Sequence, residues 1–88
     1  MCIKVGEKTY FLDRTYYYQE IVGTNILAFA MKNYQIMITF KTAADRTTVT
    51  AWIDKNSITS AVVLNTQMAT LKVTPIKIEI ISGTTKIC

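Results

Sequence analysis

The chain has 88 residues, of which half are apolar and 18% are charged; its net charge is +4 and it contains no histidine. This length predicts one domain, residues 1–88, with a thin core, because such a chain buries only about 60–65% of the surface that its unfolded form exposes. Without histidine the chain cannot build a Ser/His/Asp or Cys/His catalytic site, and a structural zinc site lacks its imidazole ligand.

The first predicted strands form a hairpin at the N-terminus. Ile3 and Val5 share one face of a strand expected at residues 2–5, and residues 8–12 form the returning strand. Gly6 and Glu7 connect them as a two-residue loop with glycine first, which is the arrangement of a type II′ turn.

Three further strands are expected over residues 16–22, 26–32 and 34–40. Turns at residues 23–25 and at Asn33 join them. Residues 34–40 alternate between apolar and polar side chains, a period of two that is typical of a strand with one buried face.

The segment 26–31 differs from the other strands because it is apolar at both odd and even positions. This predicts a strand covered on both faces, either at the centre of a barrel or beneath a partner subunit. We therefore expect this segment and the neighbourhood of Trp52 to make the self-contact. The candidate interface residues are Ile26, Leu27, Phe29 and Met31.

Residues 42–55 are compatible with a strand or a helix. Thr42 followed by Asp45 fits a helix N-terminus, and Val49 and Ile53 lie at helical spacing. Against a helix, residues 47–50 read Thr-Thr-Val-Thr, which is a poor helix interior. We favour the strand and retain a helix over residues 43–55 as the alternative.

The C-terminal third predicts strands at residues 58–64, 68–74 and 76–82, with a turn at Asn65 and Thr66. The phase of the apolar alternation changes at Pro75. Because proline cannot donate to a ladder, this predicts a bulge or bend on an edge strand.

Composition favours the same fold class as the elements. Fourteen residues are threonine, and isoleucine, valine and tyrosine are frequent. These β-branched and aromatic side chains fit a pleated surface. We predict an all-β fold, a small antiparallel meander barrel or sandwich of about eight short strands, with α+β as the alternative.

Charge and hydropathy bear on partners and location. Soluble domains usually carry about 25% charged residues, so this chain is expected to expose apolar surface and to form a homo-oligomer. No signal peptide is recognisable, and the longest uncharged apolar run is far shorter than the about 20 residues that span a bilayer. We expect a cytoplasmic protein without a membrane partner.

Two cysteines, Cys2 and Cys88, stand near the two ends of the chain. A bridge between them, or between subunits, requires oxidising surroundings. Without a secretory signal we expect both to be reduced thiols.

Nothing in the sequence predicts catalysis, a metal or a cofactor. Three of the six carboxylates, Asp13, Asp45 and Asp54, each precede a basic residue near an expected strand end, which is typical of solvated turns. No glycine-rich loop precedes a helix. We therefore expect a protein that is not an enzyme.

An aromatic and basic set suggests a binding function instead. Tyr16 and Tyr18 share a face, and tyrosine rings can stack on bases while arginine binds phosphate in a bidentate manner. The candidate ligand-binding residues are Arg14, Tyr16, Tyr18, Arg46 and Trp52. The competing interpretation is that the aromatic residues are half-buried in the sheet.

These observations rank three non-catalytic functions. The first is an oligomerising module that binds itself or another protein. The second is a sequestering binder of a small anionic, nucleotide-like ligand, for which a phage-encoded protein in the host cytoplasm is one setting. The third is a β-barrel that binds single-stranded nucleic acid, which the lack of any Lys/Arg run disfavours.

Overall fold

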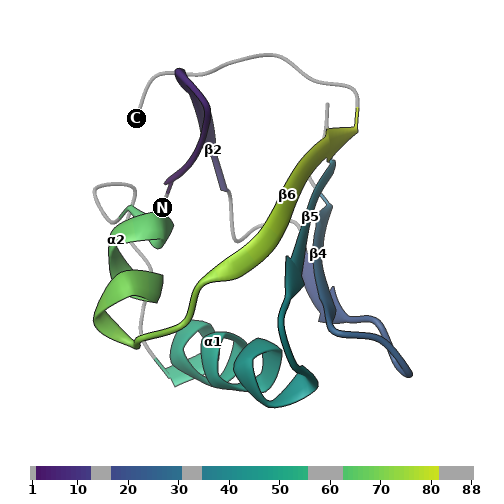
Figure 1. Ribbon diagram of the computed structural model, residues 1–88. Coiled ribbons are helices and arrows are strands. Elements are labelled where there is room, and N and C mark those ends of the chain that lie inside the picture. Colours follow the sequence, from purple (N-terminus) through teal and green to yellow (C-terminus); the bar gives the residue numbers. More distant parts are fainter. Residues whose placement is uncertain (1, 13–16, 31–34, 56–62, 82–88) are drawn as a thin grey trace.

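The computed structural model describes residues 2–12, 17–30, 35–55 and 63–81. These residues form two antiparallel sheets and two helices, α1 (Ala43–Lys55) and α2 (Leu64–Thr70). In Figure 1, α1 lies below the sheets and α2 lies beside the smaller one. The protein is thus β-rich, and it fits the α+β alternative better than the all-β barrel or sandwich. The turn expected at Asn33 lies outside the described residues.

The smaller sheet is the predicted N-terminal hairpin. Strand β1 (Cys2–Val5) pairs with β2 (Lys8–Phe11), and Val5 lies opposite Lys8. Gly6 has φ +64°, whereas Glu7 does not have a positive φ, as expected for a type II′ turn.

The larger sheet has four strands in the order β3-β4-β5-β6. They are β3 (Tyr17–Glu20), β4 (Ile26–Ala30), β5 (Gln35–Phe40) and β6 (Pro75–Ile81). The expected alternation is present in β5, where Ile36, Ile38 and Phe40 are buried and the residues between them are not. The predicted irregularity at Pro75 is also confirmed, because the register with β5 shifts between Thr39 and Phe40 and β6 lies at the sheet edge.

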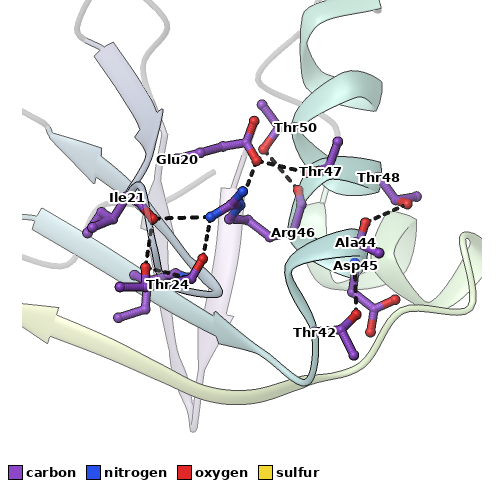
Figure 2. Close-up of polar contacts among 11 residues, drawn as sticks. Glu20, Ile21, Thr24, Thr42, Ala44, Asp45, Arg46, Thr47, Thr48 and Thr50 are labelled. Carbon is purple, nitrogen blue, oxygen red and sulfur yellow. Dashed lines mark hydrogen bonds and ion pairs between the residues drawn. The ribbon is translucent and has the colours of Figure 1, made fainter.

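The strand favoured over residues 42–55 is wrong, because this segment is helix α1 (Ala43–Lys55). The Thr42 hydroxyl accepts a hydrogen bond from the Asp45 amide at 3.2 Å and caps the helix. The hydroxyls of Thr48 and Thr50 donate to carbonyls one turn back, so their polar groups are satisfied within the helix (Figure 2).

Burial explains why α1 prevails over threonine's preference for strands. Val49 and Ile53, four residues apart, are fully buried, and α1 contacts β3, β4 and β5. A helix therefore places both side chains on one sheet face, and this tertiary contact outweighs a propensity difference of a few tenths of a kcal/mol per residue.

The strands expected at residues 58–64 and 68–74 are also corrected within the described part of the chain. Leu64–Thr70 is helix α2, which includes the residues predicted to form a turn, Asn65 and Thr66. Leu64 and Met68 are buried at helical spacing. The Asn65 side chain also accepts from the Lys4 amide at 2.7 Å and donates to the Lys4 carbonyl, which fastens α2 to β1.

The core lies between the large sheet, the two helices and the N-terminal hairpin. Its buried side chains are Ile3, Tyr10, Leu12, Leu27, Phe29, Ile36, Ile38, Phe40, Val49, Ile53, Leu64, Met68 and Val73. Cys2 is also fully buried and is disulfide-bonded, so the reduced thiol expected for Cys2 is wrong. Cys88 lies outside the described residues.

Candidate interaction surface

The free edge of β6 is the most distinctive feature of the surface. Strand β6 pairs with β5 along one side, and no strand within the described ranges pairs with its other side. In Figure 1 it is the nearest strand of the large sheet to the viewer. Ile76 is 66% exposed and Ile81 46% exposed, so this edge carries large apolar side chains in contact with water.

The backbone direction in β5 follows from one hydrogen bond. The Phe40 amide donates to the Asn25 carbonyl at 2.9 Å, so the main-chain groups of Phe40 point toward β4. Because these groups alternate in direction along a strand, those of Thr39 and Met37 point the opposite way, toward β6.

The partners of those two residues in β6 are Lys77 and Glu79. The N–H and C=O groups of Lys77 and Glu79 are therefore used in the ladder with β5. By the same alternation, the main-chain groups of Ile78 and Ile80 point to the free edge. These groups form a template on which another strand can pair.

Two opposite charges lie on the outer face of β6. The Lys77 ammonium is 3.5 Å from the Glu79 carboxylate, and both side chains are largely exposed. Residues two apart share a strand face, with Ile78 between them pointing inward. The sequence of this stretch predicted only a strand, and the charges that flank its middle residue symmetrically are the signal that could have identified it as a site.

Arg46, predicted to bind a ligand, instead joins α1 to the β3–β4 hairpin. Its Nε lies 2.6 Å from Glu20 Oε2, and its Nη1 donates to the Ile21 carbonyl at 3.1 Å and to the Thr24 carbonyl (Figure 2). Thr47 donates to the same Glu20 oxygen at 3.0 Å. The guanidinium is thus engaged by protein acceptors, and its side chain is only 14% exposed.

Tyr18 and Trp52, the two described aromatic members of the predicted ligand set, pack against the core. The Tyr18 ring centroid is 5.8 Å from that of Phe29, and the Tyr18 hydroxyl donates to Asp54 Oδ1 at 2.5 Å. Trp52 is partly buried against the core. Arg14 and Tyr16 lie outside the described residues, so a pocket formed by the full set stays a prediction.

The predicted interface residues on β4 occupy a central strand. Leu27 and Phe29 are buried in the core beneath α1, so their side chains are not offered to a partner. Ile26 is half-buried, and Met31 lies outside the described residues. Strand β4 thus lies at the middle of a four-stranded sheet, and its second face is half-buried, so the described fold does not show the barrel centre that was one of the two expected settings. Cover by a partner subunit stays a prediction.

A shallow depression lies on the outer face of the large sheet. Its volume is about 190 Å³, and it is lined by Gln19, Ile21, Ala28, Phe29, Ala30, Gln35 and Met37. Ligand pockets usually span roughly 300–1,000 Å³. This depression is too small for a nucleotide and has no charged residue to bind phosphate.

The part of the chain that the structure describes contains no group of three or more His, Cys, Asp or Glu side chains that could hold a metal ion. Within the same residues no helix has the length and apolar character needed to cross a bilayer.

Comparisons of the chain with protein-family models, with curated proteins and with solved structures find no match, so the inference of function rests on the geometry above.

Proposed function

We propose that this chain is a non-catalytic interaction module that associates with copies of itself. The observation that carries the proposal is the unpaired edge of β6 within the described fold, with Ile76 and Ile81 exposed along it. Proteins that remain monomeric usually protect such edges with charges, prolines, bulges or a covering segment.

Strand β6 carries such protective features only at its N-terminal end and on its outer face. Pro75 and the neighbouring register shift disturb the start of the strand, but pairing with β5 is regular from Lys77 to Ile81. Lys77 is the sole basic residue of β6, and Glu79 lies 3.5 Å from it. An edge with balanced charge repels a second copy less than an edge of one sign.

The non-catalytic part of the proposal is supported by the chemistry of the side chains. The sequence has no histidine. Among the described carboxylates, Glu20 binds Arg46, Asp54 accepts from Tyr18, and Glu79 pairs with Lys77. Each of these three carboxylates thus has a structural partner among the described residues, which supports a structural role for it.

Sedimentation equilibrium, supported by light scattering, tests the proposal. Self-association predicts that the weight-average mass rises from one chain toward a multiple of it between low micromolar and several hundred micromolar concentration. The rise should persist in moderate salt, since apolar burial contributes to it. A single-chain mass across the whole range would overturn the proposal.

A further inference from the structure

We propose that β6 pairs antiparallel with β6 of a second copy around a twofold axis at Ile78, joining the two four-stranded sheets into one continuous sheet. This inference rests on the self-association proposed above and names its surface and its register. Ile78 is the middle residue of the seven in β6, and Lys77, Ile78 and Glu79 form the regular centre of the pairing because the register shift lies beside Ile76.

Charge complementarity selects this register. With the axis at Ile78, Lys77 lies opposite Glu79 of the second copy, and the twofold axis repeats the pair. Moving the axis to Lys77 or to Glu79 would place like charges opposite each other, which is destabilising. Moving it to a point between two residues would place isoleucine opposite a charged residue and mismatch the faces.

The apolar residues match in the same register. Ile78 lies opposite its own copy, and Ile76 lies opposite Ile80 of the second chain. Ile78 and Ile80 are half-buried on the side of the core, whereas Ile76 is 66% exposed. Pairing therefore brings the two inner Ile78 side chains together across the axis and covers Ile76, which a single copy leaves in water.

The backbone geometry agrees with the side chains. The main-chain groups of Ile78 face the free edge, so the two copies of Ile78 form a hydrogen-bonded pair on the axis. Lys77 and Glu79 of the second copy then form a non-hydrogen-bonded pair, in which the Cα atoms approach to about 4.5 Å and side chains lie closest. The charges thus meet at the position where they interact best.

Charge reversal provides the test, with sedimentation equilibrium at low salt as the readout. Lys77→Glu and Glu79→Lys each create two like-charge pairs across the axis, and each should raise the dimer dissociation constant about tenfold or more. An equimolar mixture of the two variants restores opposite charges at both pairs. It should form a heterodimer of about wild-type affinity, as should the doubly reversed chain with itself.

Lys41→Glu is the matched control, because it makes the same charge change at an exposed residue beyond the end of β5. Measured at the same salt concentration, its dimer affinity should stay within about twofold of wild type, because Lys41 forms no cross-strand pair in this register. Melting curves of all variants confirm that each one folds.

Hydrogen exchange gives a second measurement that needs no substitution. The amides of Ile78 and Ile80 face the free edge, so their exchange should slow at least tenfold as protein concentration rises through the dimer range. The amides of Lys77 and Glu79, which donate to β5, should be protected at every concentration.

The possible outcomes separate the two proposals. A wild-type chain that stays monomeric overturns self-association and this register together. Suppose that the wild type dimerises, that both single reversals dimerise as tightly as Lys41→Glu, and that their mixture shows no preference for the heterodimer. This result overturns the β6 register alone. Loss of the homodimers with recovery in the mixture supports it.

Discussion

The guanidinium of Arg46 on α1 lies 2.6 Å from the carboxylate of Glu20 at the end of β3, and it also reaches the carbonyls of Ile21 and Thr24. Figure 2 shows the side chain reaching from the helix into the β3–β4 turn. A residue predicted from the sequence to bind phosphate thus connects the helix to the sheet.

We expect Arg46→Ala to lower the free energy of unfolding by roughly 1.5–3 kcal/mol, because it removes charge-assisted hydrogen bonds at a partly buried site. Arg46→Lys should lose about half as much, since lysine retains the charge but not the planar fork. Urea denaturation measures both, and Lys41→Ala, at an exposed position, should change stability by less than about 0.5 kcal/mol. Equal effects of Arg46→Ala and Lys41→Ala would contradict the structural role.

Thr48→Ala tests whether α1 is a helix in solution. Thr48 is exposed, and its hydroxyl bonds only to the Ala44 carbonyl among the described contacts. In a helix the substitution should raise the free energy of unfolding by about 0.5 kcal/mol, because alanine has the higher helix propensity. The same substitution in a central strand, Thr39→Ala, should lower it by a similar amount. Thermal melts of the pair should therefore move in opposite directions, and a decrease for both would count against the helix.

Lys72→Gly should stabilise the protein. Lys72 follows α2 with φ +60°, and the amides of Lys72 and Val73 donate to the carbonyls of Ala69 and Met68, which is the Schellman pattern. Glycine adopts this backbone without the penalty of about 1 kcal/mol that a side chain incurs. The midpoint of urea unfolding should rise. Gly6→Ala, at φ +64°, should lower it, and a lower midpoint for Lys72→Gly would refute the left-handed cap.

The disulfide at Cys2 should respond to reduction. Because Cys2 is fully buried, we expect its bridge to lie within one chain, and Cys88 is the other cysteine of the sequence. A bridge that closes a long loop typically contributes about 2–4 kcal/mol, so a reductant should lower the melting temperature. Without reductant, the denatured protein should contain no titratable thiol and should migrate as one chain. A covalent dimer on a non-reducing gel would place the bridge between subunits instead.

Several elements were predictable from the sequence because their evidence is local. The alternation over residues 34–40 and 76–80 depends only on which side chains face the core. The turns at Gly6 and Gly23 depend on a positive φ that glycine adopts readily, and both glycines have one. Pro75 indicated an edge strand because it has no amide to donate.

The segments 43–55 and 64–70 were decided by tertiary contacts. Their threonines and the spacing of their apolar residues suit a strand and a helix almost equally, so the intrinsic propensities for the two structures are nearly balanced. Burial of Val49 and Ile53 against the large sheet decides the first, and the contact of α2 with β1 through Asn65 and Lys4 decides the second. Those neighbours are distant along the chain.

The same division applies to the candidate interface. By itself, the sequence Ile-Lys-Ile-Glu-Ile determined that β6 is an amphipathic strand with Lys77 and Glu79 on one face. Only the strand order, within the residues that the structure describes, leaves one side of β6 unpaired while placing β4 between two other strands, although the composition of β4 had suggested the contact. The physical reason is that side-chain character is a property of single residues, whereas exposure depends on which strands become neighbours, and long-range packing decides that.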